Sequence, residues 1–475
     1  MRAVPAEQQA PHPDRWKALA VCLVAGFMTL LDVSIVNVAL PSIESGLGAS
    51  DNELQWIVSG YALTLGLLLV PAGRLGDARG RRSVFMTGVA LFVLASVACG
   101  LAPSAVALVI ARLLQGFAGG LVTPQVSGTI QDLFRGEERG KAFGWFGTVV
   151  GVSTAVGPLL GGALIALFGS GEGWRAVFFV NVPVGLLALV LAHRYLPAPE
   201  RAEGRRASLD PLGVALLGGA VVCLLVPFVE QRSWHSPLRP ALFGVAALLL
   251  LVWVWHERRY GRTREPVVSL ELFQIRSFVL GTGVGVLYFA GFTATFFILT
   301  QYLQIGLGYP AWKAGLAATP FAVGGALTAA LGSRNVLRRG RALVAFGLAT
   351  VIAGIAGVWL AVEAHPGAEV GLWTALPLLL AGLGGGLVIS PNQTLTLNQV
   401  PVRRAGSAGG FLQTGQRIGS AAGIAVTGSV FYGSLAADHD FAVAFRHGLI
   451  SIAAFVAAAL ALALADALTR PDRRG

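Results

Sequence analysis

Long apolar runs alternate with short polar segments along the whole 475-residue chain. Fourteen of these runs approach the ~20 residues that an α-helix needs to cross a bilayer. They lie at about 18–40, 54–71, 83–101, 104–123, 142–166, 174–196, 211–229, 240–255, 278–301, 314–331, 342–362, 372–389, 406–432 and 448–468. The pattern predicts an all-α membrane protein with fourteen transmembrane helices.

The composition agrees with a chain embedded in a lipid bilayer. Hydrophobic residues make up 55% of the chain and charged residues 12%, whereas a soluble domain has roughly 25% charged residues. A chain with so few charges could not cover itself with a polar surface, so lipid must be its solvent. The three cysteines lie inside apolar runs, so the sequence indicates no disulfide framework.

Lysine and arginine are distributed unevenly between the predicted loops. If the N-terminus is placed in the cytoplasm, the inner segments carry 28 of the 35 basic residues and the outer segments carry 5, while Arg112 and Arg417 lie within spans. Cytoplasmic loops of membrane proteins are enriched in basic residues. We therefore predict a multi-pass protein of the cytoplasmic (inner) membrane with both termini in the cytoplasm. The net charge of +11 then reflects topology and does not indicate nucleic acid.

Two basic stretches divide the predicted spans into groups of six, two and six. The first stretch covers 193–210 and the second covers 256–276. Repeated bundles are common in transporter folds. We predict an N-terminal six-helix bundle at 1–196, a linker with two additional transmembrane helices at 197–277, and a C-terminal six-helix bundle at 278–475.

One acidic residue, Asp32, lies well inside a predicted span. A carboxylate within the membrane is costly and marks a functional site. Asp32 lies nine residues before Pro41, at the outer end of its span, and Arg112 lies nine residues after Pro103, at the outer end of its own. At ~1.5 Å per residue both lie at the same depth. We predict that Asp32 and Arg112 meet or share a water-filled site and couple transport to protons; a static ion pair is the alternative.

Other polar side chains within spans are candidates for a substrate cavity. We assign Asn37, Gln115, Tyr288, Asn392 and Arg417 to it. Arg417 is a second buried cation that either holds helices together or lines the pathway. Tyr288 begins an aromatic stretch that either lines the cavity or packs in the core. A single buried carboxylate balances about one positive charge, so we expect monovalent cationic or neutral substrates.

Two glycine-containing segments are candidates for conformational roles. The loop after the second span, 73–82, places Gly73, Asp77, Gly80 and Arg81 within ten residues. Glycine permits a tight turn between two spans. An aspartate among arginines at helix ends can bond helix N-termini and neighbouring charges.

In the fifth span, Gly157 is followed by Pro158. Proline removes a helix hydrogen bond, so this pair predicts a kink, although glycine and proline are also common in ordinary membrane helices.

These motifs resemble those of the major facilitator superfamily. The loop at 73–82 has the order G-x-L-x-D-x-x-G-R-R, the fourth span reads R-x-x-Q-G at 112–116, and the fifth has G-x-x-x-G at 147–151 followed by G-P at 157–158. The segments at 31–41, 181–185 and 266–273 are similar to the fourteen-helix drug:proton antiporter branch. The resemblance implies the major-facilitator fold, with two six-helix bundles, two inserted helices and alternating access.

The resemblance also implies a function. It predicts a monomeric, proton-coupled antiporter that exports small amphipathic drugs or antibiotics. The alternatives are a dedicated exporter of one endogenous metabolite or a symporter of the same superfamily. The sequence contains no P-loop, no metal-spaced Cys/His cluster and no hydrolytic triad. We therefore expect no enzyme activity, no cofactor and no metal; a membrane-embedded enzyme and a sensor without flux are the rival classes.

The topology can be tested with cysteine labelling. After replacement of Cys22, Cys99 and Cys223, an Arg79→Cys variant should be protected from a membrane-impermeant maleimide in intact cells and labelled once the cells are opened. Lys313→Cys, in a predicted outer loop, is the control and should be labelled in intact cells. Labelling of Arg79→Cys from outside would exclude the fourteen-span arrangement.

Overall fold

The computed structural model describes residues 12–169, 171–197, 210–229, 238–262, 266–332 and 340–468. This part of the chain is helical and contains no strands. The helices of the first part are α1 (Arg15–Leu47), α2 (Asp51–Arg79), α3 (Arg81–Gly100), α4 (Ala105–Leu133), α5 (Gly136–Phe168), α6 (Gly173–Phe179) and α7 (Asn181–Tyr195). They are followed by α8 (Pro211–Val229) and α9 (Leu238–Tyr260).

The remaining helices belong to the second part of the chain. They are α10 (Arg276–Thr300), α11 (Ala311–Gly332), α13 (Arg341–Ala364), α14 (Val370–Trp373), α15 (Ala375–Leu397), α16 (Ala405–Asp438) and α17 (Phe441–Leu468). Short turns of other helical types flank them: η2 (Leu270–Gln274), η3 (Gln301–Gly306) and η5 (Val402–Arg404).

Among the described residues, 12 helical segments are long and apolar enough to cross a membrane. The pairs α6 with α7 and α14 with α15 each form one such segment. Each of the predicted apolar runs coincides with a helix, but α8 and α11 are not among the 12. The protein is thus an all-helical, multi-pass membrane protein with 12 to 14 candidate spans, and the count of fourteen stays a prediction.

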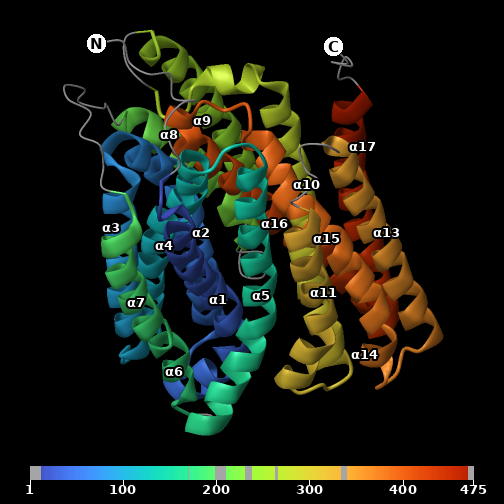
Figure 1. Ribbon diagram of the computed structural model, residues 1–475. Coiled ribbons are helices and arrows are strands. Elements are labelled where there is room, and N and C mark those ends of the chain that lie inside the picture. The colour runs from blue at the N-terminus through green and yellow to red at the C-terminus, as the bar shows by residue number, and fades with distance from the viewer. Residues whose placement is uncertain are drawn as a thin grey trace, which may run out of the picture.

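The helices pack in two groups, α1–α7 and α10–α17, which we call the first and second halves (Figure 1). The halves meet where α2 packs against α16 and where α5 packs against α11 and α15. Helix α8 contacts α2, α16 and α9. The domain boundaries at 196 and 277 stay predictions.

One end of the molecule carries the start of α1 and the end of α17, and we call it the terminal end (Figure 1). There, Gly80 alone separates α2 from α3, and its φ of 94° lies in the region that favours glycine. The tight turn predicted for this loop is present. Nearby, a Cβ added at Gly73 would lie 2.2 Å from the carbonyl oxygen of Gly406. The backbones of α2 and α16 therefore approach each other at a point that only glycine allows.

A methyl group at Gly73 should force these helices apart. We expect Gly73→Ala to shift the protein toward conformations that are open at the terminal end. Double electron–electron resonance between spin labels at Ser83→Cys and Gln399→Cys, in a cysteine-free background, measures that opening. Gly162→Ala is the matched control, since no atom lies within 4 Å of a Cβ added there. Equal distance distributions in the two variants would contradict the expectation.

Candidate functional site

Asp32 of α1 and Arg112 of α4 form an ion pair inside the first half. Nη1 of Arg112 donates to Oδ2 of Asp32 at 2.5 Å. Asp32 is 0% exposed and Arg112 is 1% exposed. The structure therefore brings together the two residues that the sequence placed at equal depth, and it encloses both among helices.

Two further side chains complete the surroundings of the carboxylate. Gln115, one turn along α4 from Arg112, donates from Nε2 to Oδ1 of Asp32 at 2.9 Å. Asn181, the first residue of α7, donates from Nδ2 to the same oxygen at 2.9 Å. Both amides also donate to the hydroxyl of Ser96 on α3, at 2.6 Å and 3.2 Å. We call these five residues the Asp32 network.

Arg112 also connects the Asp32 network to α2. Its Nε donates to the carbonyl oxygen of Ile57 at 3.0 Å. Its guanidinium carbon lies 4.2 Å from the centroid of the Tyr61 ring, a cation–π geometry. The Tyr61 hydroxyl in turn donates to the carbonyl oxygen of Thr29 on α1 at 3.2 Å. The packing of α1, α2 and α4 at mid-height therefore depends on one guanidinium.

This arrangement stabilises an ionised carboxylate within an apolar bundle. Burying two charges costs several kcal/mol per ion, which is offset only when the geometry is good and the remaining polar atoms are bonded. Asp32 accepts from three donors and Arg112 donates to three acceptors. The Asp32 network therefore meets the conditions under which a buried ion pair is tolerated.

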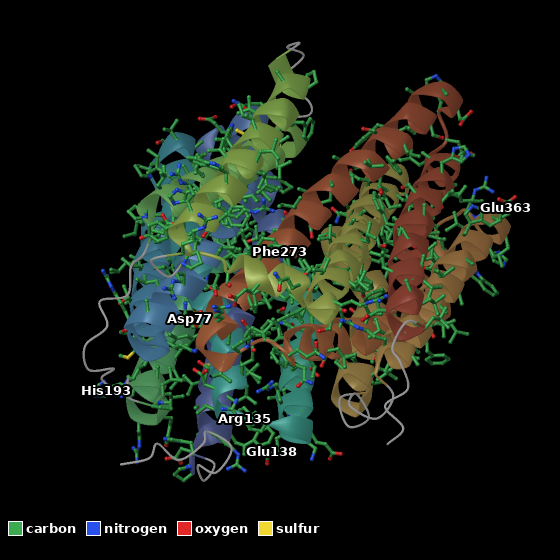
Figure 2. All side chains as sticks on the ribbon, turned by 90° about the horizontal axis from the view of Figure 1, so that it is seen from above. Asp77, Arg135, Glu138, His193, Phe273 and Glu363 are labelled. Atoms are coloured by element: carbon green, nitrogen blue, oxygen red, sulfur yellow. The ribbon has the colours of Figure 1, made fainter. Side chains whose placement is uncertain are left out.

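The loop after α2 joins the two halves at the terminal end. The Asp77 carboxylate accepts from the backbone N–H groups of Gly406 and Ser407 at 3.0 Å and 2.9 Å, at the start of α16. Free N–H groups at a helix N-terminus favour an anion. Arg81 forms ion pairs with Asp77 at 2.9 Å and with Asp132 of α4 at 2.5 Å. Figure 2, seen from the terminal end, shows Asp77 where the first half meets α16.

Gly157 and Pro158 lie on α5 between the halves. A Cβ at Gly157 would lie 2.0 Å from Oγ of Ser34 on α1, and the Ser34 hydroxyl donates to the carbonyl oxygen of Ser153 at 3.0 Å. On the other side, a Cβ at Gly315 of α11 would lie 3.0 Å from Pro158. Helix α5 continues through the Gly-Pro pair as one helix from Gly136 to Phe168. The pair therefore marks a close approach of α5 to a helix from each half.

The residues assigned to a substrate cavity lie in different places. Gln115 belongs to the Asp32 network. Asn37 is exposed on α1, and its amide donates to the carbonyl oxygen of Val33 at 3.1 Å. Arg417 is half-buried on α16 beside α2. Among the described residues, no hydrogen bond joins these three side chains, so their assignment to one substrate cavity stays a prediction.

Asn392 of α15 lies in a second buried polar network, within the second half. Arg341, the first residue of α13, donates to the Asn392 side chain, to Asp466 of α17 at 2.6 Å and to the carbonyl oxygen of Ser277 at 2.9 Å. Asn392 donates to the carbonyl oxygen of Gly281 at 2.8 Å. This network ties helices of the second half together near the terminal end. Our sequence reasoning did not select Arg341, which we counted as a loop residue.

Tyr288 begins a chain of aromatic contacts in the second half. Its ring stacks on Phe292 with centroids 5.9 Å apart, and Phe292 contacts Phe296 at 5.2 Å and Phe321 of α11 at 5.7 Å. Phe292, Phe296 and Phe321 line a small apolar cavity together with Gly147 and other residues of α5, α11 and α15. An aromatic surface therefore lies where the two halves meet, while Tyr288 itself is 1% exposed.

This fold and these motifs agree with the comparisons to known proteins. The family model "Major Facilitator Superfamily" matches residues 22–424. The chain belongs to the major facilitator superfamily and is a membrane transporter of that family.

Its relatives include antibiotic transporters. It is 36% identical to the "Puromycin resistance protein pur8" of Streptomyces alboniger, covering 99% of this chain and 95% of that protein. It is also 36% identical to the "Probable actinorhodin transporter" of Streptomyces coelicolor, covering 90% of this chain and 74% of that one. A crystal structure of a human organic anion transporter has the same fold, with a TM-score of 0.69 at 16% identity over 95% of this chain and 100% of that one. By name, these relatives are transport and resistance proteins, not enzymes.

Asn181 offers a test of the Asp32 network. Asn181→Ala removes one of the three donors to Asp32, and loss of a hydrogen bond to a charged group costs about 1–3 kcal/mol. We expect the variant in detergent to unfold at a lower temperature than the wild-type protein, as measured by tryptophan fluorescence. Asn37→Ala is the matched control, because its only hydrogen bond among the described contacts is to its own helix, and it should leave the unfolding temperature unchanged. Equal effects of the two substitutions would contradict the assigned network.

Proposed function

We propose that this chain exports small amphipathic molecules across the cytoplasmic membrane in exchange for protons, by alternating access of a cavity between its halves. The observation that carries the proposal is the Asp32–Arg112 pair, since both charges are buried at mid-height of the bundle. Ionisable groups within a membrane mark ion pathways and proton relays. The export direction is supported by the printed names of relatives, which include a "Tetracenomycin C resistance and export protein" of Streptomyces glaucescens.

In the proposed cycle, the proton acts on Asp32. While Asp32 is ionised, Arg112 is neutralised and holds α1, α2 and α4 together. When a proton reaches the carboxylate, the ion pair is lost and this attraction weakens. Helix α2 carries both the contact with Arg112, at Ile57 and Tyr61, and the contact of Asp77 with α16. A change in the packing of α2 on Arg112 would therefore reach the point where the halves are joined.

We place the substrate between the halves and not on Asp32. The carboxylate is sealed inside the first half, so a substrate in the cavity cannot touch it in this conformation. Proton and substrate therefore do not compete for one carboxylate. Their exchange is linked by the conformation of the bundle, which each of them shifts by binding one state more tightly. We also propose that the protein acts as a monomer and that both termini lie in the cytoplasm, since this topology places 28 of the 35 basic residues on the inner side.

The names of several relatives support a narrow substrate range for this chain. The names of four of them each contain one antibiotic: actinorhodin, puromycin, tetracenomycin C and methylenomycin A. Another is named a multidrug resistance protein. Export of a single natural product is therefore the second candidate within the same mechanism.

The proposal is tested by Asp32→Asn, which keeps the size and some hydrogen bonding of the side chain but cannot titrate. We expect this variant to fold and to lose proton-driven accumulation, while exchange of substrate for substrate persists. Proteoliposomes under an imposed pH gradient, with a panel of actinorhodin, puromycin and tetracenomycin C, report substrate flux and proton movement together. Glu44→Gln, which neutralises an exposed carboxylate on the same helix, serves as the matched control. Uphill transport by Asp32→Asn at the wild-type rate would remove Asp32 from the coupling mechanism.

A further inference from the structure

Arg417 lies well inside the apolar part of α16, at the interface between the halves. It follows the start of α16 by 12 residues, about 18 Å along the helix axis. Its Cβ lies 3.9 Å from the position of a Cβ added at Gly66 of α2. Thr414, one turn before Arg417, donates from its hydroxyl to the carbonyl oxygen of Gly66 at 3.4 Å. Arg417 therefore lies on the side of α16 that faces α2.

Arg417 differs from three other arginines of the helical bundle in having no acceptor among the described residues. Arg81, Arg112 and Arg341 each form an ion pair with an aspartate. Among the described residues, no hydrogen bond or ion pair is made by the Arg417 side chain. A guanidinium within a membrane span is costly without a counter-charge and marks a functional site. Arg417 is half-buried, so part of it remains accessible to an anionic partner from outside the chain.

Neighbouring polar groups are also without partners. Gln413, one turn before Arg417 on α16, is 6% exposed, and both polar atoms of its amide are buried without a hydrogen bond. Buried polar atoms in folded proteins are nearly always bonded. Gln413 and Arg417 lie one turn apart on one side of α16, and both lack a partner among the described residues. Together they indicate a place for a polar ligand.

Aromatic side chains adjoin the same stretch of α16. Ser420, one turn after Arg417, accepts a hydrogen bond from Thr293 of α10 at 2.8 Å. Phe289 lies one turn before Thr293, and its ring contacts that of Phe292 with centroids 5.6 Å apart. The guanidinium and the aromatic cluster are therefore presented by adjoining segments of the same helix pair.

We infer that the substrate is a planar aromatic molecule with an acidic oxygen, such as a carboxylate or phenolate, which Arg417 binds. This inference rests on the proposed function and names its substrate class. It revises the expectation of cationic or neutral substrates, because the carboxylate on which that expectation depended is sealed inside the first half and already neutralised by Arg112. The unpaired charge near the interface is positive, and a guanidinium matches a carboxylate with two parallel hydrogen bonds.

The inference is tested by equilibrium binding to the full-length protein in nanodiscs. The probes are anthracene-9-carboxylate, its neutral amide and 9-(aminomethyl)anthracene, which share one ring system and differ in charge. Binding is followed by anthracene fluorescence at one pH. We expect the carboxylate to bind about ten- to a hundredfold more tightly than the amide, as charge-assisted hydrogen bonds allow. The cation should bind more weakly than either.

Two variants and one control assign the effect to Arg417. Arg417→Gln should remove the preference for the carboxylate and leave binding of the amide unchanged, while Arg417→Lys should keep part of the preference. Lys313→Gln removes one positive charge elsewhere, at the start of α11, and should leave all three affinities unchanged. Undiminished carboxylate preference in Arg417→Gln would overturn the inference, as would equal affinities for the three probes or no binding of the carboxylate by the wild-type protein.

The same experiment separates this inference from the proposed function. Binding needs no proton gradient, so a carboxylate preference can be present even if Asp32→Asn transports normally. In that case the proton mechanism fails and the substrate class stands. If Asp32→Asn loses proton-driven flux and the wild-type protein shows no carboxylate preference, the proton mechanism stands and the substrate class fails.

Discussion

The ion pair between Asp32 and Arg112 is the interaction on which the packing of the first half depends. Each charge alone would cost several kcal/mol to bury, and removal of one partner from a buried pair leaves the other uncompensated. The helices that supply Asp32, Arg112 and the amides of Gln115 and Asn181 must therefore stay together while the carboxylate is ionised. Apolar contacts between the same helices impose no such condition, because lipid is as apolar as leucine.

Helix α2 connects this pair to the contact between the halves. In its N-terminal part, Ile57 and Tyr61 touch the Arg112 guanidinium. At its terminal end, Gly73 lies against the backbone of α16 and Asp77 binds the first N–H groups of that helix. Helix α2 is continuous from Asp51 to Arg79, although Pro71 within it donates no backbone hydrogen bond. The contact with Arg112 and the contact of Asp77 with α16 thus belong to one continuous helix.

The sequence predicted the helices and the Asp32–Arg112 pair, and it could not predict the partners of most other polar residues. The length of an apolar run, and the depth of a residue counted from Pro41 or Pro103, can be taken directly from the sequence. The neighbour that each helix face contacts cannot, because a membrane helix that is apolar all round has no amphipathic pattern to orient it. Asn392 was therefore assigned to a cavity, although it bonds Arg341. Asn181 was noticed only within a family motif, because nothing local indicates that the start of α7 reaches Asp32.

The two central arginines have opposite surroundings, and this difference restricts how transport can be coupled. Arg112 is saturated by acceptors from its own half, so it has nothing to offer a substrate while Asp32 is ionised. Arg417 has no acceptor in the part of the chain that the structure describes, and it lies where the halves meet. If the proton acts at the first and the substrate at the second, neither ligand displaces the other directly. Coupling then requires that the proton and the substrate favour different arrangements of the halves. The coupling free energy cannot exceed the difference in binding free energy that each ligand shows between those arrangements.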